Sequence, residues 1–252
     1  MGMSLDKVEI EGRDINFHTP FGPVIMETKI SDDLHNILLK RADQLRDGTH
    51  PNPDINAETN DYRDRLAGCL SEEYSYDKAF TEQEGAFVEA ELTWLAAHYT
   101  EAAHKARKIK KTAVRQANQL IMQKPVWVNY MKSGEWNPSH NHVGKISCVT
   151  YLRVPKEIEE ENEKGEHVKK SNTPSAGRIE FQFGNVGMPY CSGGYIRTPV
   201  EKTIFFFPAA LSHMVYPFQA DTERVSVSVN FDDRLELETA LKGVGERGPK
   251  SA

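Results

Sequence analysis

Hydrophobic and polar residues alternate along five short segments in the second half of the chain. Each segment is rich in β-branched or aromatic residues and is bounded by Gly, Pro, Ser or Asn, which is the pattern of half-buried strands. The segments are VWVNYM, ISCVTYLRV, RIEFQF, TIFFF and RVSVSVNF. Because these strand patterns follow one another after a helical first half, they predict an α+β chain whose C-terminal half is an antiparallel sandwich or barrel.

Two segments of the first half show helical spacing instead. The first begins at Ser31, a good N-cap residue, and stops at Gly48. The second begins at Thr81 and extends to about Leu120, as one long helix or two helices end to end. Its apolar positions recur at steps of three and four, at Phe87, Leu92, Leu95, Tyr99 and Ala103.

The remaining segments are less regular. Residues 1–30 carry two short β-type patches, KVEIEG and PVIMETKI, and residues 49–80 are polar and rich in Pro and Asn, which predicts an ordered loop. Residues 156–175 form a solvated insertion rich in Lys and Glu, which could be a lid or a plain surface loop. We expect the last residues, GVGERGPKSA, to be a frayed tail.

Composition narrows the class of protein. Thirty-one basic residues against 37 acidic ones leave a formal charge of -6 over 252 residues, so we expect no nucleic-acid partner. The basic run at 105–115 is better explained as a solvated helix face. The longest apolar stretch, 204–211, is too short for a membrane span, and three scattered cysteines make no disulfide framework. These features predict a soluble, cytoplasmic protein without membrane contact.

Candidate chemistry gathers around three histidines. His140 and His142 are separated by one residue, so on a strand both imidazoles would project from one face and reach one metal ion. His213 follows a buried strand that could lie opposite this pair. Arg224 and Ser226 share a face of the last strand, and an arginine inside a β core requires an internal acid or an anionic ligand.

The order of these motifs resembles a known family. The motifs are Tyr130, Gly134, the HNH segment, the VTYL run that contains Tyr151, Gly177 with Glu180, the FFFP run before His213, and Arg224 with Ser226. Together they resemble the double-stranded β-helix core of 2-oxoglutarate/Fe(II)-dependent oxygenases over roughly residues 121 to 232. Within them the chain is most similar to the prolyl-hydroxylase-like branch, and to uncharacterised bacterial and phage proteins with an HNH segment. The first 120 residues carry no such motif.

The resemblance implies a metal site. His140 and His213 match the two ligating histidines, and His142 stands where the family usually has aspartate. A third imidazole keeps a ligand but raises the charge of the site by one unit, which could change the metal or the co-substrate. Glu180 could replace the carboxylate, but its neighbours Ile179 and Phe181 are equally good candidates for the inward face.

The resemblance also implies a co-substrate site. Arg224 matches the residue that holds the distal carboxylate of 2-oxoglutarate, and Ser226 and Tyr151 assist it. Tyr130 matches a pocket residue near the co-substrate. We interpret Trp127 as a core residue, whereas Trp136, just before the metal motif, is the better candidate for a groove wall.

The implied protein is an Fe(II)-, 2-oxoglutarate- and O2-dependent hydroxylase, with His140, His142, His213 and Arg224 as its catalytic residues. Its substrate would be peptidyl, prolyl-type, or a small molecule. The implied fold is a jelly-roll, cupin-like core at residues 121–235 with the insertion 156–175 as a mobile segment, supported by strands and helices of residues 1–120 and followed by a tail at 236–252. Two alternatives remain: a keto-acid-independent three-histidine dioxygenase, and a binding module with a structural metal. The long helix could pack on the core or form a homodimer contact.

Overall fold

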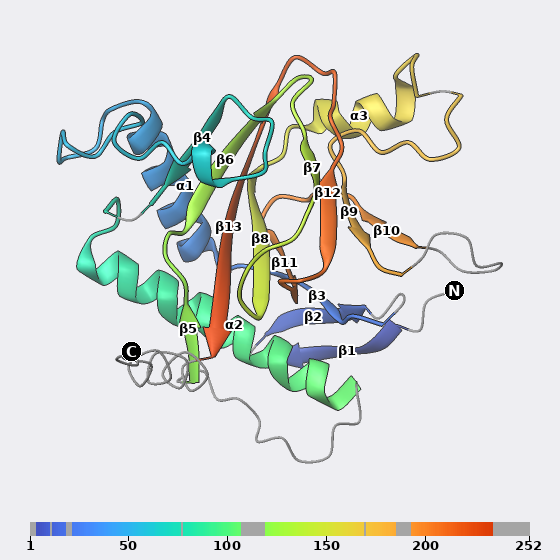
Figure 1. Ribbon diagram of the computed structural model, residues 1–252, viewed down its shortest axis with the longest axis horizontal. Coiled ribbons are helices and arrows are strands. Elements are labelled where there is room, and N and C mark those ends of the chain that lie inside the picture. Colours follow the sequence, from blue (N-terminus) through green and yellow to red (C-terminus); the bar gives the residue numbers. More distant parts are fainter. Residues whose placement is uncertain are drawn as a thin grey trace, which may run out of the picture.

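The computed structural model describes residues 4–10, 12–18, 22–76, 78–106, 119–168, 170–184 and 193–233. Two antiparallel sheets face each other and form a sandwich, with helices on the outer side of the larger sheet (Figure 1). This architecture confirms the α+β prediction. No helix in the described ranges is long and apolar enough to cross a membrane.

The larger sheet has the strand order β1-β2-β3-β11-β8-β13-β6-β4, and β5 also pairs with β13. Every pairing in it is antiparallel. Its strands are β1 (Ser4–Ile10), β2 (Arg13–His18), β3 (Ile25–Lys29), β4 (Glu72–Ser75), β5 (Leu120–Met122), β6 (Trp127–Lys132), β8 (Ile146–Arg153), β11 (Thr203–Pro208) and β13 (Glu223–Asp233).

The smaller sheet has the order β10-β9-β12-β7. Its strands are β7 (Asn137–His140), β9 (Ile179–Gln182), β10 (Gly194–Arg197) and β12 (Ser212–Val215). Between the two sheets lies an apolar layer to which Phe205 and Phe207 of β11 and Phe181 of β9 contribute, all at most 1% exposed. This layer holds the sheets together around the pocket described below.

Two helices cover the outer face of the larger sheet. Helix α1 (Asp32–Arg46) begins where expected, because the Ser31 side chain accepts a hydrogen bond from the Leu34 amide at 3.1 Å. Helix α2 (Glu82–Ala106) buries Leu92, Leu95 and Tyr99 in the same core as the sheet, so its apolar face packs on the β core. Phe87, expected on that face, is 38% exposed. Residues 107–118, where the sequence predicted more helix, lie outside the described residues, and Leu120 begins a strand.

Three segments differ from their predictions. The segment 49–80 contains a short 3-10 helix, η1 (Arg63–Arg65), and the edge strand β4. The insertion 156–175 contains helix α3 (Lys156–Lys164), which is anchored rather than solvated throughout, because the buried Glu161 carboxylate accepts backbone hydrogen bonds from Gln219 and Ala220 at 2.8 Å. The tail predicted at 236–252 lies outside the described residues.

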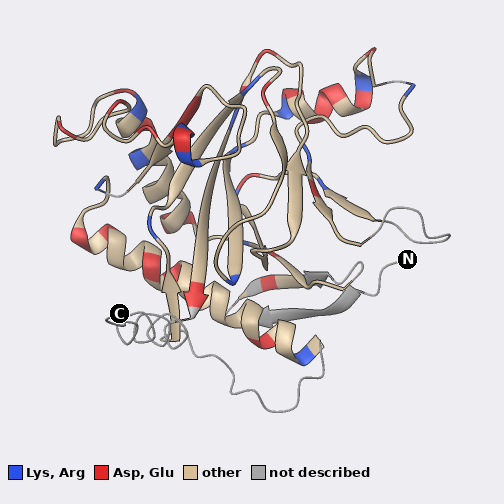
Figure 2. Cartoon of the chain, in the orientation of Figure 1, with Lys and Arg blue, Asp and Glu red and all other residues tan. Residues whose placement is uncertain are grey.

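Charged side chains lie mainly on the helices and loops, while the strands of the sandwich are mostly uncharged (Figure 2). Against this background a charged residue buried between the sheets is unusual, because each one carries a large desolvation cost. Arg224, which is 2% exposed, and Glu73, which is 1% exposed, are two such residues. Both line the same pocket.

Candidate active site

Three histidines meet at one end of the smaller sheet. Ligand atoms of His140, His142 and His213 all lie within 4.8 Å of one another. His213 of β12 stands directly opposite His140 of β7 in the strand register. The prediction that a distant strand brings His213 to the pair is therefore confirmed, although His213 lies on its own short strand rather than at the end of the phenylalanine-rich one. His142 lies beyond the end of β7, where its backbone amide donates to the Ala209 carbonyl at 2.8 Å. It reaches the cluster from a loop, so the expectation of two histidines on one strand was wrong.

Backbone carbonyls orient two of the imidazoles. Nδ1 of His140 lies 2.7 Å from the Pro138 oxygen, and Nδ1 of His213 lies 3.0 Å from the Leu211 oxygen. A carbonyl can only accept, so both Nδ1 atoms carry the proton and both Nε2 lone pairs are free to bind a metal. Nε2 of His142 and Nε2 of His213 are 3.2 Å apart. Two nitrogens bound to one ion at about 2.1 Å and at right angles would lie about 3.0 Å apart, so the spacing suits a shared metal.

Burial keeps the imidazoles of His142 and His213 neutral. It lowers the pKa of His142 to about 4 and that of His213 to about 3, with a smaller contribution from the neighbouring His140 in each case. A neutral imidazole is the form that binds a metal, so both side chains are competent ligands at pH 7. Aromatic rings supply the low-polarity surroundings, since Phe207 packs edge-on to His213 with ring centroids 4.8 Å apart and Trp127 lies 5.7 Å from His142.

A cation without an acidic partner lies in the same pocket. Arg224 donates to the Gly177 carbonyl at 2.7 Å and to the Met131 sulfur at 3.0 Å, while its Nε–H has no partner. No acidic side chain in the described part of the chain forms an ion pair with it, and burial lowers its pKa. The Tyr151 ring lies 5.4 Å from the guanidinium, and its hydroxyl is also buried without a partner. Burial raises the pKa of Tyr151 to about 12, so this hydroxyl stays protonated.

The strand register explains how these groups meet. On β13, Arg224 and Ser226 lie on the same face, and Ser226 stands opposite Tyr151 of β8. All three line the pocket together with the histidines. The structure therefore brings Arg224, Ser226 and Tyr151 together in the pocket that contains the three histidines.

Tyr130 does not join them. It is fully buried, but it packs against Tyr74 and under the Arg46 guanidinium, 4.4 Å above its ring, on the helix-covered side of the sheet. Its neighbours on β6, Trp127 and Asn129, face the pocket instead. The expectation that Tyr130 lies near the co-substrate was wrong, because Tyr130 lies on the face of β6 that points away from the pocket.

Other sequence interpretations can be placed as well. Glu180 lies between the inward-facing Ile179 and Phe181, and its carboxylate accepts a hydrogen bond from the Tyr216 hydroxyl, so it does not substitute for a metal-binding carboxylate. Trp136, the expected groove wall, is 39% exposed and does not line the pocket. Trp127, expected only in the core, does line it.

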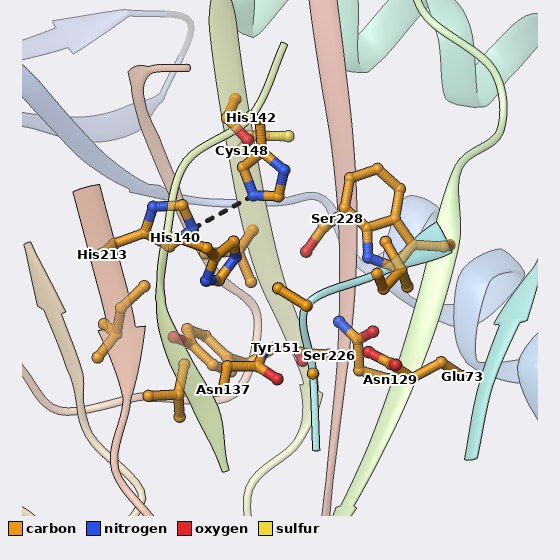
Figure 3. A pocket seen from close by; sticks show the side chains of 18 of the residues that line it. Glu73, Asn129, Asn137, His140, His142, Cys148, Tyr151, His213, Ser226 and Ser228 are labelled. Carbon is orange, nitrogen blue, oxygen red and sulfur yellow. Dashed lines mark hydrogen bonds between the residues drawn. The ribbon is translucent and has the colours of Figure 1, made fainter. Parts of the chain in front are cut away.

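Sequence reasoning missed five polar residues of this pocket: Glu73 on β4, Asn129 on β6, Asn137 on β7, Ser147 on β8 and Ser228 on β13. In Figure 3 the imidazoles are grouped on one side, and Ser226, Asn129 and Glu73 follow toward the opposite side. Asn129 could have been found from its alternation with Tyr130, but nothing in the polar segment 49–80 pointed to Glu73.

Known proteins share this fold and part of this sequence. Residues 125–230 match the family described as "Putative 2OG-Fe(II) oxygenase". The solved structure of AviO1 from Streptomyces viridochromogenes Tue57 is 12% identical, with 83% of this chain and 89% of that one covered and a TM-score of 0.50. SnoK, a non-heme alpha ketoglutarate dependent carbocyclase from nogalamycin biosynthesis, is 8% identical, with 83% and 79% covered and a TM-score of 0.50. A Pseudomonas putida prolyl-4-hydroxylase is 13% identical, with 81% and 87% covered and a TM-score of 0.45. No curated protein sequence matches the chain.

The fold is thus the double-stranded β-helix, or jelly roll, that the motif order implied. Residues 125–230 match the model of a 2-oxoglutarate/Fe(II)-dependent oxygenase family, whose members use Fe(II), 2-oxoglutarate and O2. The finer likeness to bacterial and phage proteins with an HNH segment stays a prediction.

Proposed function

We propose that His140, His142 and His213 hold Fe(II), that Arg224, Ser226 and Tyr151 hold 2-oxoglutarate, and that the enzyme hydroxylates a peptidyl or small-molecule substrate. The observation that carries the proposal is the buried, acid-free Arg224 in the same pocket as the three imidazoles. The family match over residues 125–230 supports it.

The arginine fits a dicarboxylate. A buried guanidinium without an anion costs several kcal/mol, about as much as it would recover from a bound carboxylate. The free Nε–H of Arg224 and the partnerless Tyr151 hydroxyl supply two donors for such a carboxylate, and the Ser226 hydroxyl lies on the same face. A carboxylate accepts through two oxygens, so these donors match it in number and kind.

The residues around the pocket would have different roles, according to where they lie. When bound, Fe(II), 2-oxoglutarate and O2 would supply the oxidising chemistry: the keto acid would lose CO2, one oxygen atom of O2 would enter the succinate and the other the substrate hydroxyl. Two backbone carbonyls hold the imidazoles of His140 and His213 in the tautomer that binds a metal. Phe207 and Trp127 exclude water from the histidine end of the pocket, which strengthens each polar contact there.

The two alternatives fit the pocket less well. A keto-acid-independent dioxygenase could use three imidazoles but would leave Arg224 unexplained. A structural zinc site would saturate its ligands and has no need of the partnerless donors of Tyr151 and Arg224. For the substrate, the prolyl-type guess rests on the resemblance alone.

The test is an anaerobic titration of the purified chain with Fe(II) and then 2-oxoglutarate, followed through the weak visible charge-transfer band of a chelated keto acid. We expect the band in the wild type and its loss in Arg224→Ala. Arg41→Ala is the matched control, because Arg41 is also buried but pairs with Glu84 between helices α1 and α2 and does not line the pocket. Fe(II) binding without a band in the wild type would favour the keto-acid-independent enzyme, and no Fe(II) binding would favour the binding module.

A substitution at His142 tests the third ligand. His142→Asp restores the usual two-histidine, one-carboxylate set and lowers the charge of the occupied site by one unit. We expect tighter retention of Fe(II) during dialysis against a chelator. Unchanged retention in both His142→Asp and His142→Ala would show that this residue does not bind the metal.

The proposal extends to the rest of the chain. Helices α1 and α2 pack on the larger sheet, which supports a single unit in which residues 1–120 brace the oxygenase core at 121–235. We also propose that the enzyme works in the cytoplasm without nucleic-acid partners, in keeping with its formal charge of -6. A homodimer stays a prediction, and size-exclusion chromatography with light scattering would test it.

A further inference from the structure

A set of hydrogen-bond acceptors, called the acceptor site below, lines the same pocket as Arg224. Glu73 is 1% exposed and Asn129 is 5% exposed, while Asn137 is partly buried. One side-chain oxygen of each is buried with no hydrogen-bond partner: Oε2 of Glu73, Oδ1 of Asn129 and Oδ1 of Asn137. Because native proteins satisfy most buried polar atoms, three partnerless acceptors in one pocket indicate a ligand that donates.

The strand register relates this acceptor site to the co-substrate site. Glu73 of β4 stands opposite Asn129 of β6, which stands opposite Ser226 of β13, which in turn stands opposite Tyr151 of β8. Neighbouring strands are about 5 Å apart, so Glu73 and Ser226 are about 10 Å apart across the sheet. One polar row therefore crosses four strands, from the acceptors of Glu73 and Asn129 to the hydroxyls of Ser226 and Tyr151.

The buried, unpaired carboxyl group of Glu73 lowers the stability of the protein when no ligand is bound. Burial, with repulsion from Glu135 as a smaller cause, raises the pKa of its carboxyl to about 7. Within the described part of the chain no cation is hydrogen-bonded to it, and Arg63, the basic group that lowers its pKa, is exposed and bonded to Asp61. A residue that served stability alone would be paired or apolar at this position.

Gly68 packs closely against two of the acceptors. A Cβ atom on this residue would stand 2.6 Å from Oδ1 of Asn137 and 2.7 Å from Oε1 of Glu73. The segment is held in place by a hydrogen bond from the Cys69 amide to the Trp136 carbonyl at 2.9 Å. A side chain at position 68 would collide with both oxygens and displace them, so only glycine allows the two acceptors to keep these positions.

We propose that Glu73, Asn129 and Asn137 bind a primary ammonium group of the oxygenase substrate. An ammonium group has three N–H donors and no acceptor, which matches three acceptors, one of them anionic. The proposal rests on the proposed function, because the ammonium group would lie in the same pocket as the iron and the keto acid. It narrows the substrate class to amino compounds, such as a peptide amino terminus or a lysyl side chain.

The experiment measures binding of four probes to the full chain by calorimetry, with and without Zn(II) and 2-oxoglutarate. Glycinamide represents an amino terminus, and Nα-acetyl-lysine amide represents a lysyl side chain. Their fully acetylated forms carry an acetyl group on the same nitrogen and have no ammonium group. We expect one of the two amines to bind and both acetylated forms to bind at least about tenfold more weakly. Equal binding of amine and acetylated forms, or no binding of either amine, overturns the proposal.

Two variants locate the binding. Glu73→Gln keeps the shape and removes the charge, so we expect it to weaken amine binding at least about tenfold. Glu72→Gln is the matched control, because Glu72 is the neighbour on the other face of β4, where it pairs with Lys132. Gly68→Ala should also weaken amine binding, since its methyl group would collide with the acceptor oxygens of Asn137 and Glu73 and displace them. Retention of amine binding in Glu73→Gln overturns the proposal.

The affinity for 2-oxoglutarate separates this proposal from the proposed function. We expect Glu73→Gln to bind 2-oxoglutarate as the wild type does, and to melt at the same or a higher temperature, which a structural role would not allow. If the wild type binds 2-oxoglutarate but no amine, the ammonium site is wrong and the oxygenase function stands. If it binds the amine but no 2-oxoglutarate, the ammonium site stands and the proposed oxygenase function is wrong.

Discussion

The two faces of strand β13 are equally buried but differ in chemistry. Val225, Val227 and Val229 are at most 2% exposed and pack in the core beneath α1 and α2. Arg224 and Ser226 are 2% exposed and line the pocket on the opposite face. Burial stabilises the valine face through the hydrophobic effect, whereas it leaves the guanidinium without a counter-charge.

The difference shows how the protein separates stability from function within one strand. Strand residues alternate between faces, so each second residue can serve the core while its neighbours serve the site. The pocket face retains groups that cost stability, which is expected where a ligand completes them. Substitutions on the valine face should therefore lower the free energy of unfolding, and substitutions on the pocket face should lower the affinity for 2-oxoglutarate.

The largest effect is expected at Arg224. In Arg224→Met, an apolar side chain of similar length replaces the uncompensated charge, so the free energy of unfolding should stay constant or rise. The affinity for 2-oxoglutarate should fall about a hundredfold, because truncating one partner of a buried charge pair costs about 2–5 kcal/mol. Calorimetry and thermal melting check the two parts separately. A large loss of stability would place Arg224 among the structural residues instead.

Glu73 should make the wild type less stable as the pH rises. Its folded pKa of about 7 lies above its ordinary value of 4.5, so the folded state binds the proton more tightly. The stabilisation is complete below pH 4.5 and is lost as the pH rises through 7. The loss is on the order of 2–3 kcal/mol, and Glu73→Gln should not show it. Urea unfolding of both proteins at acidic and at mildly alkaline pH measures the difference. A constant gap between them would contradict the raised pKa.

Much of this site could be predicted because its residues carry strong chemical constraints. Histidines with metal-like spacing and an arginine in an apolar strand are seldom explained together by structural roles alone, and their order matched a known family. The same reasoning failed at Tyr130, since β6 is buried on both faces and its alternation does not show which face lines the pocket. A strand must be placed in its sheet before its facing is known.

Glu73 and helix α3 escaped prediction for a different reason. Strand β4 has only the sequence EEYS and joins the sheet edge, so its pairing with β6 comes from tertiary contacts rather than from local propensity. Helix α3, KEIEEENEK, is almost wholly polar, and its position depends on Ile158 and on the contacts of Glu161. Local patterns contain little information about such contacts.

The valine face should respond to substitution in the opposite way to Arg224. Val227→Ala removes two buried methyl groups from the core and should lower the free energy of unfolding by about 2 kcal/mol. The affinity for 2-oxoglutarate should not change, because the side chain points away from the pocket. Urea unfolding and the same calorimetric titration check both parts. A marked loss of co-substrate affinity would mean that the two faces are coupled.

The smallest effect is expected at Tyr130, and it distinguishes the observed facing from the expected one. The Tyr130 hydroxyl is buried without a partner on the helix-covered side, so Tyr130→Phe removes an unsatisfied polar group. Stability should stay constant or rise by less than about 1 kcal/mol, and the affinity for 2-oxoglutarate should not change. Tyr151→Phe is the matched comparison on the pocket face, where loss of the hydroxyl should weaken 2-oxoglutarate binding by about 1 kcal/mol, or about fivefold. If Tyr130→Phe weakens the co-substrate as much as Tyr151→Phe does, then β6 turns its other face to the pocket in solution, and the polar row from Glu73 to Tyr151 is lost with it.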